Sequence, residues 1–429
     1  MLYYSLHNNA PKVSFSEAVV KGLAPDKGLY FPETITPLPS SFFDTIENLD
    51  PIEIGYQTIK QFIGDEIPEA VLKSILKDVL SFDFPVVSIE KNIGTLELFH
   101  GPTMAFKDVG ARFMARCLEY FNENNKNQVT VLVATSGDTG GAVAQGFLGV
   151  RGVNVVILYP SGKVSDIQER QLTTLGKNIT ALEVDGVFDD CQDMVKKAFL
   201  DESITAHKQL TSANSINIAR WLPQLFYFVF AYKQLKNKKK DIVFSVPSGN
   251  FGNICAGIVA NKLGLPVKHF VAATNINDTV VRYMENSEYN PQPSKATISN
   301  AMDVGNPSNF IRIQQLFDNN FESLKNRFSA FSFDDSTTKE AMKQIYEETK
   351  YIADPHGAVG YLGLKKYQLQ ENEYGVFLET AHPVKFLDIV EETLNTTVEI
   401  PSQIKKVLNK EKVSLKIKDY QKLKEFLLK

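Results

Sequence analysis

Residues 129–148 read VTVLVATSGDTGGAVAQGFL, an apolar β-branched run that passes through a glycine-rich turn into a helix-forming stretch. A similar apolar run followed by a helical pattern returns at NVVILYP (154–160), ITALEVDG (179–186) and DIVFSVPSG (241–249). Apolar strands that alternate with helices indicate parallel strands covered by helices on both faces. The sequence therefore predicts an α/β fold.

The chain divides into three expected parts. Its 429 residues exceed one small domain and favour two or three. Residues 1–85 are expected to form an N-terminal helical segment with Pro-rich loops, in which Ser14 caps a helix. Residues 86–240 are expected to form mostly a small α/β lobe and residues 241–429 a large one. We expect the small lobe to be inserted within the large one, so the division is not a single cut.

Composition excludes several classes of function. A net charge of −4 argues against a protein that coats nucleic acid or an anionic membrane. The three cysteines lie far apart without a CxxC pair, and the histidines form no HxxxH pattern, so we expect no metal site. The start of the chain lacks the pattern of a signal peptide, and the most apolar run, 222–232, is shorter than the roughly 20 residues that span a bilayer. These features predict a cytoplasmic protein.

Two glycine-rich turns stand where a predicted strand passes into a helix. They are SGDTG at 136–140 and SGNFGN at 248–253. Such turns let backbone N–H groups converge on an anion at a helix N-terminus. Neither turn has the P-loop pattern, and neither has the GxGxxG pattern with an acidic ribose-binding residue, so a nucleotide site is not indicated. Two cradles in one chain predict two anionic groups.

A lysine precedes a third helix. Lys107 lies between Phe106 and Asp108, directly ahead of an amphipathic helix. An isolated lysine at such a position is ordinarily a surface residue, yet a cation there meets the unfavourable end of the helix dipole. Burial beside another electropositive feature lowers the pKa of a lysine and makes its amine a nucleophile. The pattern suits an amine that forms an imine with an aldehyde cofactor, whose phosphate would lie on one of the cradles.

Four segments together resemble one family. FHGPTMAFKD (99–108), ATSGDTGGA (134–142), PSGNFGN (247–253) and ETAHPVKF (379–386) look like the corresponding motifs of the threonine synthases, which are pyridoxal-phosphate-dependent enzymes of fold type II. The resemblance is to the longer type found in bacteria and fungi, and it runs over essentially the whole chain. It implies two doubly wound α/β lobes behind the N-terminal helical segment and pyridoxal 5'-phosphate as cofactor. A monomer or a homodimer is expected, and the sequence does not decide between them.

The resemblance also implies roles for individual residues. Lys107 would form the Schiff base with the cofactor and then move protons at Cα and Cβ of the substrate, and Thr380 would bond the pyridine nitrogen. The cofactor phosphate would lie on Gly249, Asn250, Phe251, Gly252 and Asn253. The substrate carboxylate would lie on Ser136, Gly137, Asp138 and Thr139. Many relatives of the wider class have asparagine at the position of Asp138, so the function of this carboxylate is an open point.

A clamp for a substrate phosphate is expected in two further stretches, YPSGKVSDIQ (159–168) and SANSINIARW (212–221). An arginine, a lysine and hydroxyls suit an oxyanion, because charge-assisted bonds to phosphate are strong. From spacing alone, an ordinary salt bridge or helix cap accounts for these side chains equally well. With the resemblance, the expected phosphate residues are Lys163, Ser215 and Arg220, and the same stretches also offer Ser161, Ser165, Asn214 and Asn217.

The predicted reaction converts O-phospho-L-homoserine and water into L-threonine and phosphate. The first alternative is another lyase with the same cofactor, either a serine/threonine dehydratase or a phospholyase; a dehydratase needs no second phosphate clamp. The second alternative is a silent relative that binds the cofactor without turnover, which loss of Lys107 or of the 247–253 loop would have signalled. Structural hydrogen bonding is the expected role of His100, His356 and His382.

Overall fold

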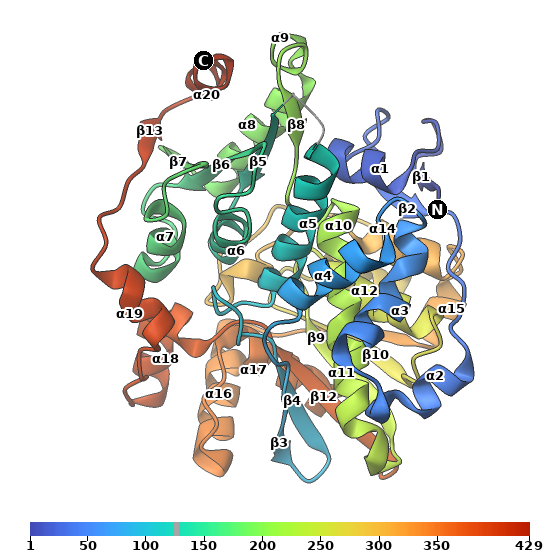
Figure 1. Cartoon of the computed structure of the whole chain (residues 1–429). Coiled ribbons are helices and arrows are strands. Elements are labelled where there is room, and N and C mark those ends of the chain that lie inside the picture. Colours follow the sequence, from blue (N-terminus) through green and yellow to red (C-terminus); the bar gives the residue numbers. More distant parts are fainter. Residues whose placement is uncertain (124–127) are drawn as a thin grey trace.

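Two β-sheets organise the protein in a computed structural model that describes residues 1–123 and 128–429 (Figure 1). The larger sheet has the strand order β11 (Phe328–Ser332), β10 (His269–Thr274), β9 (Asp241–Pro247), β12 (Glu373–Glu379), β4 (Ile93–Glu97) and β3 (Val86–Glu90). The smaller has the order β13 (Leu415–Ile417), β7 (Ile179–Val184), β6 (Val153–Pro160), β5 (Val129–Ala134) and β8 (Gln209–Thr211). Only β3 pairs antiparallel to its neighbour in these two sheets, so the predicted α/β class is confirmed.

The apolar runs that decided the fold form central strands. Every residue of β5 is buried, as is every residue of β12, and β9 is buried after Asp241. Parallel strands of this kind need helices on both faces. The helices of the small lobe are α5 (Lys107–Asn122), α6 (Asp138–Gly146), α7 (Asp166–Thr173), α8 (Phe188–Leu200), α9 (Glu202–Thr205) and α20 (Tyr420–Leu428).

Helices also cover the larger sheet. α12 and α17 pack against its strands, and the buried aromatic helix α11 lies on α12. Between residues 218 and 408 the α-helices are α10 (Ile218–Trp221), α11 (Leu225–Leu235), α12 (Gly252–Lys262), α13 (Thr279–Asn286), α14 (Phe310–Leu316), α15 (Phe321–Lys325), α16 (Asp335–Thr349), α17 (Pro355–Tyr367), α18 (Leu387–Leu394) and α19 (Ser402–Leu408). In the part of the chain that the structure describes, no helix is both long and apolar enough to cross a membrane.

The N-terminal segment is mainly helical and lies along one side of the molecule (Figure 1). It contains a short antiparallel pair, β1 (Tyr3–Ser5) and β2 (Tyr30–Pro32), followed by α2 (Ser40–Asp44), α3 (Pro51–Ile63) and α4 (Glu69–Val79). Its first helix, α1 (Phe15–Lys21), begins as predicted, because the hydroxyl of Ser14 accepts from the N–H of Glu17 at 3.2 Å. α1 and α4 contact α5, the helix that begins at Lys107, and α2 and α3 lie beside α11 and α12 (Figure 1).

The two sheets do not follow the chain in simple order. β3 and β4, which precede Lys107, belong to the larger sheet, since β4 pairs with β12. Near the C-terminus the chain returns to the smaller sheet, where β13 pairs with β7. The expected range 86–240 therefore begins with two strands of the larger sheet, and the expected range 241–429 ends with a strand of the smaller sheet.

Candidate active site

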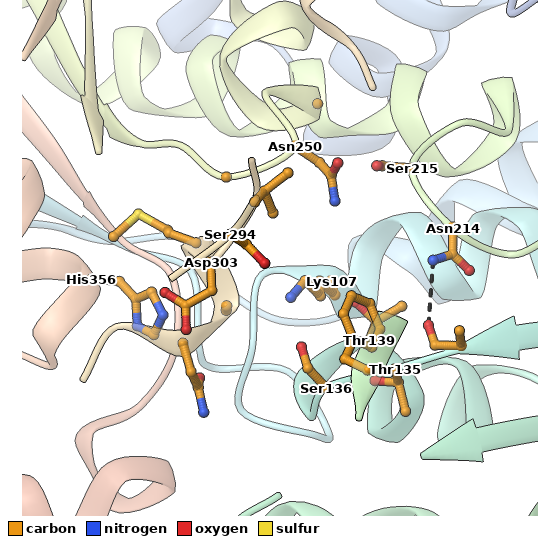
Figure 2. Close-up of a pocket in the computed structure, with 18 of the residues that line it drawn as sticks. Lys107, Thr135, Ser136, Thr139, Asn214, Ser215, Asn250, Ser294, Asp303 and His356 are labelled. Atoms are coloured by element: carbon orange, nitrogen blue, oxygen red, sulfur yellow. Dashed lines mark hydrogen bonds between the residues drawn. The ribbon is translucent and has the colours of Figure 1, made fainter. Parts of the chain in front are cut away.

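A cavity of about 650 Å³ lies where strands of both sheets end. Its lining includes residues at or just beyond the carboxyl ends of β5, β6, β9 and β12. Open α/β sheets bind ligands at this edge. Figure 2 shows Lys107 near the middle of the cavity, with Asn250 on one side and Ser136 and Thr139 on the other. The structure thus brings the lysine and both glycine-rich turns into one site.

Lys107 is the first residue of α5 and is half-buried, with its amine facing the cavity (Figure 2). Burial lowers the pKa of Lys107; the carboxylate of Asp138 opposes this effect, while the charges of Lys385 and Arg220 add to it. The backbone around the lysine is held firmly. The N–H of Phe106 donates to the carbonyl of Thr380 at 2.8 Å, and Arg220 Nη1 donates to the carbonyl of Lys107 at 2.9 Å. The amine therefore projects from a rigid backbone and gives up its proton more readily than an exposed lysine.

The turn at 248–253 leads from β9 into α12. No described residue accepts a hydrogen bond from the backbone N–H groups of Phe251, Gly252 or Asn253. A Cβ at Gly249 would lie 2.9 Å from the carbonyl oxygen of Ala301, so this close approach requires glycine. Phe251 adopts the left-handed conformation, with φ of 61°, which is uncommon outside glycine and marks local strain. Free N–H groups at the start of an 11-residue helix make this turn an anion cradle.

The turn at 136–140 is a second cradle, organised by Thr135. The Thr135 hydroxyl accepts from the N–H groups of Gly137 and Gly140, at 3.0 and 2.8 Å. Gly137 has φ of 149°, and a Cβ there would lie 2.5 Å from the Gln168 side chain, so only glycine fits. Ser136 and Thr139 line the cavity, whereas Gly137 and Asp138 do not.

Asp138 is instead buried in an ion pair. Its Oδ1 lies 2.8 Å from Nζ of Lys385, with the two side chains 4% and 0% exposed, and it also accepts from Gln168 at 3.0 Å. Burial alone would raise the pKa of Asp138, but the charges of Lys385 and Lys107 outweigh burial and hold it well below its usual range. Lys385 Nζ also donates to the carbonyl of Thr103 at 2.9 Å. This pair joins the second cradle to the segment that carries Thr380.

Arg220 lies in the cavity wall next to the backbone of Lys107. Its guanidinium donates to the carbonyls of Ala213 and Lys107, and no described carboxylate forms an ion pair with it. Burial lowers the pKa of Arg220 to about 10, so it stays protonated at neutral pH. Lys163 and Ser215 also line the cavity, so all three residues expected at a substrate phosphate are brought together. Thr380 lines the cavity as well.

Several other candidates have local structural roles. Ser165 forms a capping box with Gln168 at the start of α7, Asn217 caps α10, and Ser161 donates to Glu183 at 2.5 Å. His382 accepts from the N–H of Val384, and burial lowers the pKa of His382 to about 4. These contacts are those of a helix cap or an ordinary hydrogen bond, so they fit a structural role for each of these side chains.

Two parts of the site were not singled out from the sequence. The segment 294–304 contributes much of one wall, including Asp303, and Lys385 holds Asp138. His356, expected to make structural contacts, also reaches the cavity, where Figure 2 shows it on the same side as Asp303. Lys385 lies in the ETAHPVKF segment, but nothing in that segment indicates a partner for it. The 294–304 segment has no strand-to-helix turn that would mark it as part of a site.

The cavity fits pyridoxal phosphate. It offers an amine with a lowered pKa, a phosphate cradle that tolerates no Cβ at Gly249, and the hydroxyl of Thr380 at the end of β12. The fold and this site define a pyridoxal-phosphate-dependent enzyme of fold type II. The family model described as "Pyridoxal-phosphate dependent enzyme" matches residues 94–378.

Two further models narrow the family: "Threonine synthase N terminus" matches residues 2–80, and "Threonine synthase, C-terminal" matches 357–427. The chain is 44% identical to the threonine synthase of Buchnera aphidicola subsp. Baizongia pistaciae over 100% of both chains. The crystal structure of threonine synthase from Escherichia coli superposes with a TM-score of 0.94 at 43% identity, covering 100% of this chain and 99% of that one. The pyridoxal-phosphate-bound threonine synthase from Brucella melitensis superposes with a TM-score of 0.93 at 32% identity, covering 100% and 98%. The chain belongs to the threonine synthase family, as the sequence motifs predicted.

Proposed function

We propose that the chain converts O-phospho-L-homoserine and water into L-threonine and phosphate, with Lys107 as the residue that holds the cofactor and transfers protons. The observation that carries this proposal is that one cavity contains the amine of Lys107 together with two helix-start cradles and the guanidinium of Arg220, which pairs with no carboxylate of the described residues. The cofactor and this substrate each bring a phosphate, and the substrate also brings a carboxylate. The cavity offers a cationic or N–H donor group for each of these three anions.

The cofactor phosphate is assigned to the cradle that begins α12, and the pyridine nitrogen to the hydroxyl of Thr380. Phe106 and Lys107 follow the short backbone bridge between Ala105 and Ala381, so the lysine and Thr380 are held on neighbouring chain segments. When bound, pyridoxal phosphate supplies an electron sink that spreads negative charge away from the substrate carbons. The site residues then have to hold the cofactor ring, its phosphate and the substrate in the correct relative orientation.

The substrate is assigned to the small-lobe side of the cavity. Its carboxylate suits the turn at 136–140, where the hydroxyls of Ser136 and Thr139 line the cavity and no described residue accepts from the N–H of Thr139. Its phosphate suits Arg220 and Lys163, which are cationic and without carboxylate partners in the described ranges. Arginine binds phosphate in a planar, two-pronged geometry, and lysine acts as a point charge.

Lys107 is assigned the proton transfers. In the net reaction, phosphate leaves Cγ, Cγ gains one proton, and Cβ loses one proton and gains the hydroxyl of water. The remaining proton of that water goes to the phosphate, and Cα carries one hydrogen before and after the reaction. A base in the middle of the cavity can remove and return these protons, and it works best when its pKa lies near the operating pH. The lowering of the Lys107 pKa by burial acts in that direction.

The test is product formation by the purified chain with pyridoxal phosphate. We expect equal amounts of L-threonine and phosphate from O-phospho-L-homoserine, and no deamination of L-threonine. Lys107→Ala should lower turnover by about 10²–10⁴-fold, the usual contribution of a positioned acid–base group. Lys91→Ala, a change at an exposed lysine between β3 and β4, is the matched control and should leave turnover unchanged. Phosphate release without threonine, or full activity in Lys107→Ala, would overturn the proposal.

A further inference from the structure

A buried arginine outside the cavity wall connects the two phosphate-binding regions. Arg312, in α14, is fully buried, and its Cζ lies 4.2 Å from the ring centre of Trp221. Its guanidinium donates to the backbone carbonyls of Ser215, Ile216 and Tyr30, at 3.2, 2.7 and 2.9 Å. No carboxylate of the described ranges pairs with it. A buried charge without a counter-ion is costly, which raises the question of a role for Arg312 beyond packing.

Arg312 fixes the orientation of a neighbouring amide. Its Nη1 donates to Oδ1 of Asn309 at 2.7 Å. A guanidinium can only donate, so this bond decides which end of the amide faces the arginine. The Nδ2 end of Asn309 then points the other way, where it donates to Oγ of Ser215 and to the carbonyl of Asn250, both at 3.1 Å.

The amide in turn fixes the role of a hydroxyl. Ser215 Oγ accepts from Asn309, and no described residue accepts a hydrogen bond from the Ser215 hydroxyl. Ser215 lines the cavity, so its O–H is free to donate there (Figure 2). It also lies against the cofactor cradle, because a Cβ at Gly252 would be 3.2 Å from Ser215 Cβ and 3.3 Å from Asn309 Nδ2.

We propose that Arg312 is a positioning residue that acts through Asn309 to keep the Ser215 hydroxyl as a hydrogen-bond donor to the phosphate of the cofactor. The assignment rests on the proposed function of the 248–253 cradle, and it moves Ser215 from the substrate phosphate, where the sequence motif placed it, to the cofactor phosphate.

The experiment compares two ligands that differ only in the phosphate. Dissociation constants of pyridoxal and pyridoxal phosphate are measured for the full-length apoprotein, and their ratio reports the contribution of the phosphate. Ser215→Ala should lower this ratio by about 10- to 100-fold, as expected for a hydrogen bond to a charged group. Ser212→Ala is the matched control, since this hydroxyl lies in the same loop but bonds Asn214 and does not line the cavity.

Arg312→Lys tests the relay itself. Lysine keeps the charge but cannot hold four acceptors in a planar fork, so the ratio should fall as in Ser215→Ala. Combined with Ser215→Ala, it should lower the ratio no further, because both changes remove one interaction. If Arg312→Lys does not fold, Asn309→Ala replaces it in the same double-mutant cycle.

Three outcomes would overturn the inference. An unchanged ratio in Ser215→Ala, together with a raised KM for O-phospho-L-homoserine, would assign the hydroxyl to the substrate phosphate. Equal weakening of both ligands by Arg312→Lys would make the arginine a structural residue only, and so would effects that add in the double variant. Failure of the proposed function is distinguishable from all three, because the unmodified chain would then fail to form L-threonine and phosphate from O-phospho-L-homoserine, whatever ratio the variants show.

Discussion

The ion pair between Lys385 and Asp138 offers the sharpest test of how the site is built. The pair is 2.8 Å long and almost completely buried, and Asp138 begins the helix α6 that follows the second cradle. Lys385→Met keeps most of the side-chain volume but leaves a buried carboxylate without its main partner. Removing one member of a buried pair costs about 3–5 kcal/mol, so the free energy of unfolding should fall by that amount at neutral pH. Urea unfolding followed by the fluorescence of Trp221, the single tryptophan and fully buried, measures the loss.

The pH dependence gives the sign of the effect. In the unmodified chain the pKa of Asp138 is depressed, so its contribution to stability is present above its unfolded pKa of about 4 and is lost as pH falls further. In Lys385→Met that pKa rises, Asp138 takes up a proton at higher pH, and the stability difference from the unmodified chain should shrink toward pH 4.

The control is the double variant Lys385→Met/Asp138→Asn. It removes both charges and should recover most of the lost stability, because replacing a whole buried pair with neutral groups is often tolerated. A loss below about 1 kcal/mol in the single variant, or a double variant no more stable than the single one, would refute the reasoning.

Three further outcomes follow from the geometry of the site. Arg220→Lys should raise KM for O-phospho-L-homoserine at least about tenfold in steady-state assays, with little change in cofactor affinity, because lysine cannot replace the planar fork; an unchanged KM would remove Arg220 from the phosphate clamp. Gly137→Ala should lower the urea midpoint, because its Cβ would lie 2.5 Å from the Gln168 side chain at a backbone angle that favours glycine; an unshifted midpoint would contradict the close packing. Burial raises the pKa of Asp303 to about 6, so the folded state binds a proton that the unfolded state has released, and stability falls as pH rises from about 4 to about 6. Asp303→Asn should remove this fall in pH-dependent unfolding curves, and curves of unchanged slope would show that Asp303 titrates normally.

The parts of the fold that depend on local pattern could be predicted from the sequence. The run 129–135 and the turn after it have the strand, glycine and helix signals side by side, and they form β5 and α6 as expected. Lys107 could be recognised as a candidate site residue because the lysine and the start of its helix lie within one short segment. Ser14 is a third case, in which the capping residue and its partner are three positions apart.

The remaining features depend on contacts between residues far apart in the sequence. Lys385 and Asp138 are 247 positions apart, and nothing near either residue indicates the other. The sequence also does not predict that the chain returns to the smaller sheet through β13. That strand is only three residues long, and its partner β7 lies far away in the sequence. The wall formed by residues 294–304 has little regular structure, so neither helical nor strand periodicity marks it. Tertiary packing determines the Lys385–Asp138 pair, the position of β13 and the 294–304 wall, and no single segment of the sequence specifies that packing.

The most direct test of the central claim is to locate the cofactor on the chain. The holoenzyme is reduced with borohydride, which fixes the cofactor covalently to the lysine that holds it, and the modified peptide is identified by mass spectrometry. We predict modification of Lys107 alone, even though Lys163 also lines the cavity and Lys385 lies just behind it. Modification of either of those lysines instead, or a chain that carries no cofactor after reduction, would contradict the account.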